Sequence, residues 1–407
     1  MRRVLLLLPY FGDNSRRYLR AVAQLPGVVV GLLHQQSLEA LPPAERALLG
    51  GSVRIGDPLD EATVVEGARA LAAKIGPIDR VVNMLEQTQG SAAAIRAALG
   101  VPGLGVEATR NFRDKDRMKA VLREAGLPVA ASARIASDAD LLAFAARVGF
   151  PIVVKPLEGL GSRATVRVRT GDQLRELLPA MNPSEDNVWQ AEEFVTGEEN
   201  TFEAVTIDGK TQWWSGTWYR PGPLTVLENP WIQYTVALPR VEDSPEHLAF
   251  KDTNEAALRA LGLDDGLTHM EWFKRPDGRF VISEVAARPP GVHIMPMMGR
   301  AHGVDMIARW AELMVYERFA PAPRTSAVGC AFFRGQGTGG RVVRVRGLAE
   351  AQAEIGAFVV DRQLPRVGMA RSTHYEGEGW AIVQSERTED VVRALARLVR
   401  LVRVDCA

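Results

Sequence analysis

The chain reads Ile152-Val-Val-Lys155-Pro156, then Glu158-Gly-Leu-Gly-Ser-Arg163, then Thr165-Val-Arg-Val168. The first run is an apolar strand that ends on a lysine, and the glycine-rich turn after it leads back into a second strand. A lysine ammonium and bare backbone N–H groups therefore converge at one end of this hairpin, as the phosphates of a nucleotide require. Glycine-rich hairpins are more often plain turns, so the interpretation depends on what else the chain contains.

Length and charge limit the classes of protein to which the chain can belong. Its 407 residues are enough for two or three domains, and 46% hydrophobic with 24% charged residues is the composition of an ordinary globular protein. The 49 Lys and Arg residues balance 49 Asp and Glu residues, so no overall field favours nucleic acid or an anionic membrane. We expect small molecules as partners, with no nucleic acid and no membrane.

The cysteines and the first residues indicate a cytoplasmic protein. Cys330 and Cys406 form no metal-ligand or redox spacing, which fits a reducing compartment. The apolar run at 4–8 is shorter than the ~7–15 residues of a signal-peptide core, and no stretch approaches the ~20 apolar residues of a membrane span. We interpret the run at 4–8 as a buried first strand.

The first 112 residues alternate strand and helix patterns. Strands are expected at 4–8, 28–33 and 80–84, and helices at 14–24, 62–75 and 91–99. This alternation predicts a doubly wound α/β domain with a mostly parallel sheet, and the first strand is not followed by the Gly-x-Gly-x-x-Gly turn of a nicotinamide site. Glu86 follows a strand at the edge where such sheets bind ligands, so it is either a candidate substrate contact or a plain loop residue.

Four further motifs accompany the lysine hairpin. They are Arg113-Asp-Lys115-Asp-Arg-Met-Lys119, Gln190-Ala-Glu-Glu-Phe-Val195, His269-Met-Glu271-Trp-Phe273 and Glu284-Val-Ala286-Ala-Arg288-Pro-Pro-Gly291. Their order resembles that of the ATP-grasp superfamily, and more narrowly of its carboxylate–amine ligases, including the L-amino-acid ligases that make dipeptides. The resemblance covers most of the chain. It implies a lid subdomain at 113–194, a central subdomain at 195–322 and an α+β segment at 323–407 that packs on the central subdomain.

The resemblance implies ATP as a cofactor and assigns residues to its phosphates. Lys155, at the end of a strand, can reach the α- and β-phosphates as a point charge, and Lys115 is expected to approach them from the other side. Gly161, Ser162 and Arg163 would close over the β- and γ-phosphates. The alternative for both lysines is an exposed position in solvent.

A hinge segment is expected to hold the nucleoside. The resemblance assigns the adenine to Glu192, Glu193, Phe194 and Val195, whose backbone groups would pair with its edge, and the ribose hydroxyls to Glu199. Glu198 competes for the ribose role. The alternative for Glu192 and Glu193 is that they are exposed charges before a strand.

Two acids are candidate Mg²⁺ ligands on geometric grounds. Arg275-Pro-Asp-Gly278 predicts a turn between two strands. If the hairpin is centred there, Glu271 faces Ile282 and His269 faces Glu284, which makes the two acids diagonal neighbours ~7–8 Å apart at the backbone. Their carboxylates would converge on Mg²⁺, or on Mn²⁺ in its place, held between the protein and the phosphates.

The residues after the second acid bear on the metal count and on catalysis. Many members of the superfamily carry asparagine where this chain has Ala286, and an alanine cannot bind a metal, so one or two metal ions are expected. The resemblance assigns Arg288 to the transferred phosphate and the acyl intermediate, because a planar guanidinium suits the charge that develops on both. His269 and His293 are candidate substrate contacts or structural histidines.

The expected reaction transfers the γ-phosphoryl group of ATP to a carboxylate, and an amine then attacks the acyl phosphate to give an amide, ADP and phosphate. Amino acids or related small acids are the substrates that the resemblance implies, and a homodimer is its expected assembly. The alternatives are a carboxylase-like or kinase-like enzyme, or a non-catalytic ATP-binding protein. The chain has no biotinyl carrier segment, which weighs against a full carboxylase.

Overall fold

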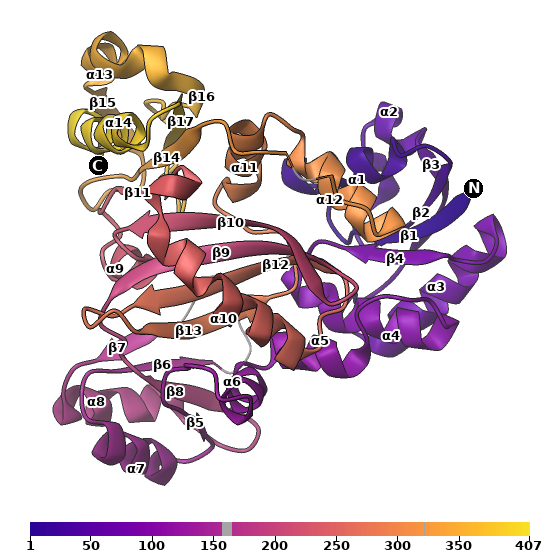
Figure 1. Cartoon of the computed structure of the whole chain (residues 1–407), viewed down its shortest axis with the longest axis horizontal. Helices are drawn as coiled ribbons and strands as arrows, with labels where there is room; N and C mark the ends of the chain where they lie inside the picture. Colours follow the sequence, from indigo (N-terminus) through magenta and orange to yellow (C-terminus); the bar gives the residue numbers. More distant parts are fainter. Residues whose placement is uncertain (157–164, 321) are drawn as a thin grey trace.

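The computed structural model of the chain describes residues 1–156, 165–320 and 322–407. Helices and sheets are mixed along its whole length, as Figure 1 shows: an N-terminal α/β unit stands beside a large central sheet, and a small unit with α7 and α8 lies below that sheet. The expected turn over the phosphates, at 157–164, lies outside the described residues.

The N-terminal unit is a parallel four-stranded sheet in the order β3-β2-β1-β4. Three expected strands and three expected helices are present, each with bounds shifted by no more than two residues. The elements are β1 (Arg2–Leu7), α1 (Asp13–Ala23), β2 (Val28–His34), α2 (Pro43–Arg46), β3 (Leu49–Arg54), α3 (Glu61–Ile75), β4 (Arg80–Asn83) and α4 (Gln89–Leu99).

The edge strand β3 is an element that the apolar pattern does not predict, because two of its residues are glycines. A Cβ atom on Gly50 would collide with Val29 of the neighbouring strand, and one on Gly51 would lie 2.7 Å from a methyl carbon of Ile75 in α3. The strand can therefore pack closely against β2 and α3 only with glycine at these positions.

The small unit contains a second four-stranded sheet, in the order β5-β8-β6-β7. Its elements are β5 (Ser132–Ile135), α7 (Asp138–Val148), β6 (Ile152–Pro156), β7 (Val166–Val168), α8 (Gly171–Met181) and β8 (Trp189–Glu193), and they follow α5 (Val106–Arg113) and α6 (Lys115–Glu124). Because β6 lies between β8 and β7, Lys155 is held at the end of an interior strand.

The central sheet has eight strands in the order β13-β12-β9-β10-β11-β14-β17-β16. They are β9 (Glu198–Ile207), β10 (Lys210–Arg220), β11 (Tyr234–Leu238), β12 (Gly266–Lys274), β13 (Phe280–Ala286), β14 (Ala327–Phe333), β16 (Val359–Gln363) and β17 (Gly379–Ser385). Since β11 pairs with β14, backbone hydrogen bonds join the segment after residue 323 to the segment before it. The domain boundaries themselves stay a prediction.

The remaining C-terminal elements cover the end of the central sheet. Helix α13 (Leu348–Ile355) and helix α14 (Thr388–Leu401) share a hydrophobic core with β14 and β17, and β15 (Val342–Arg346) pairs with β18 (Arg403–Cys406). Figure 1 places this group at the opposite end of the molecule from α7 and α8.

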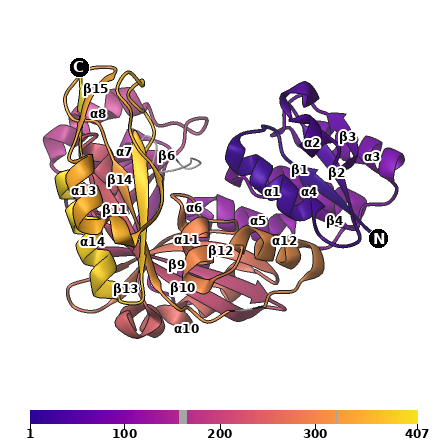
Figure 2. The same cartoon turned by 90° about the horizontal axis from the view of Figure 1, so that it is seen from above.

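Helices cover both faces of the central sheet and bury many of its side chains. Helix α10 (Pro245–Leu261) packs on one face, whereas α11 (Ile294–His302) and α12 (Met306–Tyr316) lie between the other face and the N-terminal unit (Figure 2). The ring of Phe250 in α10 stacks on Trp272 of β12, with centroids 4.2 Å apart. None of the described helices is long and apolar enough to cross a membrane.

The Phe250–Trp272 stack supplies a test of this packing. Both rings are fully buried, so Phe250→Ala should leave a cavity and lower the free energy of unfolding by ~3–5 kcal/mol in urea denaturation. Leu248→Ala is the matched control on the same helix, because Leu248 is 58% exposed, and it should change the stability by less than ~0.5 kcal/mol. Equal effects of the two substitutions would contradict the placement of α10.

Candidate active site

A cavity of about 450 Å³ lies between the small unit and the central sheet. Its walls include the strand end at Lys155, the segment that joins β8 to β9, the start of α9 (Pro223–Glu228) and the cavity side of the β12–β13 hairpin. The predicted site residues that line it are Lys115, Lys155, Glu192, Glu193, Phe194, Val195, Glu199, Glu271 and Glu284. Side chains from five separate motifs of the sequence therefore meet at one cavity.

A buried carboxylate links two lysines at the inner wall of this cavity. Glu192 Oε1 lies 2.7 Å from Nζ of Lys155, and Glu192 Oε2 lies 2.7 Å from Nζ of Lys119. Burial alone would raise the pKa of Glu192, but the two ammonium groups outweigh it and lower the pKa to about 2. Glu192 is thus ionised at neutral pH, and its side chain faces the lysines.

Lys119 belongs to this cluster, although it was not among the predicted site residues. It lies one helical turn after Lys115 on α6, and this spacing places both lysines on the same side of the helix. Its side chain is only 1% exposed, and burial lowers its pKa to about 8 although Glu192 opposes the shift. The Lys115–Lys119 spacing is the signal that could have identified it.

The two candidate metal ligands face each other directly, which corrects the expected register. Trp272, and not Glu271, pairs with Ile282, so the hairpin is one residue out of the expected register at the turn. A bulge in β13 beside Trp272 then pairs Glu271 with Glu284 and His269 with Ala286. The bulge places one extra residue, Ser283, between the pairs, so it reverses the alternation of faces along β13.

The same bulge places Ile282 and Glu284 on opposite faces of the hairpin. Ile282 is fully buried in the core beneath the sheet with Trp272, whereas Glu284 lines the cavity. Nζ of Lys115 lies 3.2 Å from Oε1 of Glu284. Two carboxylates and a lysine therefore meet on the cavity side of the hairpin.

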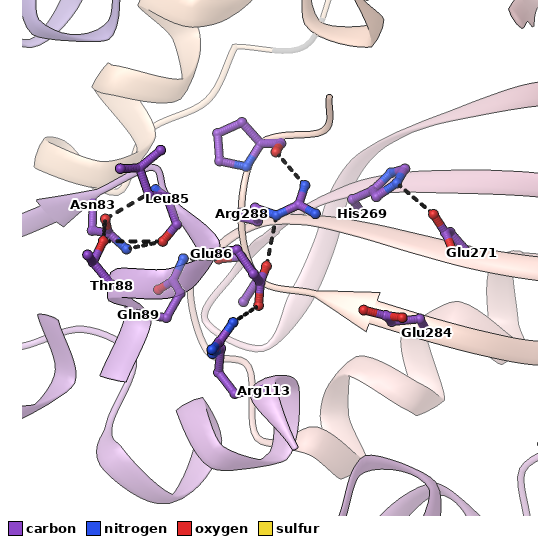
Figure 3. Close-up of polar contacts among 12 residues, drawn as sticks. Asn83, Leu85, Glu86, Thr88, Gln89, Arg113, His269, Glu271, Glu284 and Arg288 are labelled. Atoms are coloured by element: carbon purple, nitrogen blue, oxygen red, sulfur yellow. Dashed lines mark hydrogen bonds and ion pairs between the residues drawn. The ribbon is translucent and has the colours of Figure 1, made fainter. Parts of the chain in front are cut away.

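His269 is held between two carboxylates of the protein. Its Nδ1 lies 2.8 Å from Oε1 of Glu203, which is fully buried, and its Nε2 lies 3.7 Å from Oε1 of Glu271 (Figure 3). Burial alone would lower the pKa of His269, but Glu203 and Glu271 together raise it to about 9. Both ring nitrogens face protein oxygens, so the histidine orients Glu271.

Glu86 binds two arginines, one of which is the candidate catalytic residue. The carboxylate of Glu86 accepts hydrogen bonds from Arg288 Nε at 2.8 Å and from Arg113 Nη1 at 3.0 Å (Figure 3). Arg288 also donates from Nη1 to the carbonyl of Pro289 at 2.9 Å. The N-terminal unit therefore fixes the position of Arg288 through Glu86.

His293 lies outside the lining of the 450 Å³ cavity. Its ring packs 4.3 Å from that of Trp380, and its Nε2 lies 3.7 Å from Oε2 of Glu376. Burial lowers its pKa to about 4. The histidine is thus enclosed by the C-terminal segment.

The hinge segment uses part of its backbone to bind the small unit, at the residues just before β5 and β6. The N–H of Glu193 donates to the carbonyl of Ala131 at 2.9 Å, and the N–H of Phe194 donates to that of Pro151 at 3.2 Å. The carboxylate of Glu193 accepts a hydrogen bond from Arg275. The side chain of Glu193 therefore contacts the turn between β12 and β13.

Glu199 lies in the cavity wall beside the start of α9. Burial raises its pKa well above the usual range, and the charge of Glu271 adds to the shift. A Cβ atom on Gly222 would collide with its carboxylate. Gly222 thus makes room for Glu199.

Three predicted phosphate contacts cannot be placed. Gly161, Ser162 and Arg163 lie outside the described residues. Among the residues that are described, no group of three or more His, Cys, Asp or Glu side chains is arranged to hold a metal ion. Glu271 and Glu284 supply paired oxygen donors, the type that Mg²⁺ prefers, and phosphate oxygens usually complete such a site.

Residues 120–293 match the ATP-grasp domain. The L-arginine-specific L-amino acid ligase of Bacillus subtilis is 24% identical over 269 residues, which are 65% of this chain and 64% of that protein. A D-alanine–D-alanine ligase of Pseudomonas entomophila is 26% identical over 284 residues, which are 62% of this chain and 84% of that protein. The chain thus spans just under two thirds of the length of the first relative.

The fold is also that of a solved ligase. The L-amino acid ligase from Bacillus licheniformis superposes with a TM-score of 0.78 at 20% identity, covering 100% of this chain and 99% of that one. Residues 120–293 of the chain therefore form an ATP-grasp domain. The predicted family and the predicted mixed α/β fold are confirmed.

The two bonds of Glu86 make it important for stability. Glu86→Gln removes the charge between Arg288 and Arg113 in a half-buried position, and it should lower the free energy of unfolding by ~1–3 kcal/mol in urea denaturation. Glu107→Gln is the control, because Glu107 also binds two arginines but is 66% exposed, and it should cost less than ~1 kcal/mol. A Glu86 variant as stable as the control would show that Glu86 does not hold Arg288.

Proposed function

We propose that the chain is an ATP-dependent carboxylate–amine ligase that forms an amide or peptide bond through an acyl phosphate. The observation that carries the proposal is the meeting of Lys155, Lys115 and the facing pair Glu271–Glu284 around one cavity, which the hinge segment also lines. Phosphoryl transfer requires cations around the phosphates and carboxylates for Mg²⁺, and this cavity offers both.

The nucleoside would occupy the hinge side of the cavity. Since the N–H groups of Glu193 and Phe194 already bind carbonyls, the adenine edge is left to the N–H of Val195 and to the carbonyls of the segment. Glu199 would accept hydrogen bonds from the ribose hydroxyls. Its high pKa describes the carboxyl group without a ligand, and hydroxyl donors would favour the ionised form.

The phosphates would extend toward the two lysines and the two acids. Lys155 and Lys115 neutralise phosphate oxygens, while Glu271 and Glu284 would hold one or two Mg²⁺ or Mn²⁺ ions, with Ala286 contributing no ligand. Bound metal would supply further neutralisation of the phosphate charge. His269 keeps the carboxylate of Glu271 in place from the buried side.

Arg288 would bind the group being transferred. An oxygen of the substrate carboxylate attacks the γ-phosphorus while the bond from that phosphorus to the bridging oxygen of ADP breaks, and the guanidinium stabilises the equatorial charge. The amine nitrogen then attacks the acyl carbon and phosphate leaves. Amino acids are the proposed substrates, because both named relatives are amino acid ligases. We also propose a cytoplasmic homodimer, from the resemblance and the cysteine usage.

Phosphate release tests this function. Pairs of amino acids are screened with MgATP, and release that requires both a carboxylate and an amine is expected. ATP hydrolysis without an amine, transfer to bicarbonate or a hydroxyl, or binding without turnover would instead support a kinase-like, carboxylase-like or non-catalytic protein.

Two variants test the assignment of the charged groups. Lys155→Ala and Glu284→Gln should each lower turnover by at least ~10²-fold, since each removes one preorganised charge from the transfer step. Lys210→Ala, at an exposed lysine that begins β10, is the control and should leave turnover unchanged. A folded Lys155 or Glu284 variant with normal turnover would remove that residue from the site.

The contact between Gly222 and Glu199 tests the ribose position. Gly222→Ala should displace the carboxylate of Glu199 and weaken ATP binding about tenfold in calorimetric titration, the scale of one lost charged hydrogen bond. Gly171→Ala, at the start of α8 where a Cβ meets only ordinary contacts, should leave the affinity unchanged. If both variants bind ATP as tightly as the natural chain, Glu199 does not hold the ribose.

A further inference from the structure

Lys119 is a fully buried lysine that no role in the proposed reaction uses. It lies on α6, and among residues 1–156, 165–320 and 322–407 its one recorded ion pair is with Glu192, at 2.7 Å. A buried lysine is costly unless it is paired, so its retention in the interior needs a physical account.

Lys119 does not reach the cavity. Lys115, Lys155 and Glu192 belong to the cavity lining, but Lys119 does not, and its side chain is 1% exposed. An effect of Lys119 on a nucleotide must therefore pass through Glu192.

Glu192 divides its charge between two cations. One carboxylate oxygen lies 2.7 Å from Lys155 and the other lies 2.7 Å from Lys119. With Lys119 present, the three groups carry a net charge of one positive unit. Without Lys119, the carboxylate would neutralise Lys155 and could turn both oxygens toward it, away from the cavity.

We propose that Lys119 is a positioning residue for phosphate binding: it holds Glu192 from behind, so that Lys155 keeps its orientation and a net positive charge toward the cavity. The proposal rests on the proposed function, because it requires the cavity to bind the phosphates of a nucleotide. It does not depend on the identity of the carboxylate and amine substrates. The high pKa of Lys155, which burial opposes and carboxylates raise, agrees with a lysine that stays charged.

The test compares ligands with and without phosphates. MgATP and adenosine are titrated into the full chain and into Lys119→Met by isothermal calorimetry. Without Lys119 the carboxylate of Glu192 would neutralise Lys155, and the loss of one charged hydrogen bond from Lys155 to a phosphate weakens binding by about tenfold. The Kd for MgATP should therefore rise by about tenfold or more, and the Kd for adenosine should stay unchanged.

A double substitution tests whether Lys119 acts through Glu192. In the Glu192→Gln background, Lys119→Met should cause no further loss of MgATP affinity, because the carboxylate that transmits its effect is gone. Lys115→Met is the matched control on the same helix. Lys115 binds Glu284 and lines the cavity, so its substitution should weaken MgATP binding in both backgrounds.

The outcomes separate the two claims. If the natural chain does not bind MgATP, the proposed function fails. If the natural chain binds MgATP and Lys119→Met binds it equally well, or loses MgATP and adenosine alike, the inference on Lys119 fails while the function stands. Should Lys119→Met not fold, the double variant removes the buried charges of Lys119 and Glu192 together, and a tenfold weaker affinity than that of Glu192→Gln would also overturn the inference.

Discussion

The site depends on one buried carboxylate. Glu192 is 6% exposed, and it pairs with Lys119 of α6 and Lys155 of β6 at once. Because the carboxylate lies 2.7 Å from each ammonium group, both lysines can be kept at this position without unpaired charge. The arrangement fixes the end of β6 against α6, and it leaves an excess of positive charge at the wall where the phosphates of a nucleotide would lie.

A β-bulge supplies the opposite wall. The extra residue in β13, Ser283, turns Glu284 to the cavity side and places it opposite Glu271, while Ile282 enters the core with Trp272. Without the bulge Met270 would pair with Glu284, and the two acids would lie on opposite faces of the sheet. Direct pairing on one face brings two like charges together, which costs free energy unless a lysine or a metal ion lies beside them.

The sequence predicts the elements and the residue types of the site better than their contacts. Lys155 was expected at a strand end and lies there, because a local pattern determines this position. The register of β13 was predicted wrongly, since the turn offsets the pairing by one residue and the bulge offsets it by another. Lys119 binds Glu192 from a segment more than 70 residues away, and Glu86 binds Arg288 from one more than 200 residues away. No local pattern contains such contacts.

A crystal structure with Mg²⁺ and a non-hydrolysable ATP analogue tests the central claim most directly, because the claim is the position of the nucleotide. The adenine is predicted beside Phe194 and Val195, with a phosphate oxygen within about 3 Å of Lys155 Nζ and the metal bound by Glu271 and Glu284. An analogue bound with its phosphates away from Lys155, or at another surface of the molecule, would contradict the account.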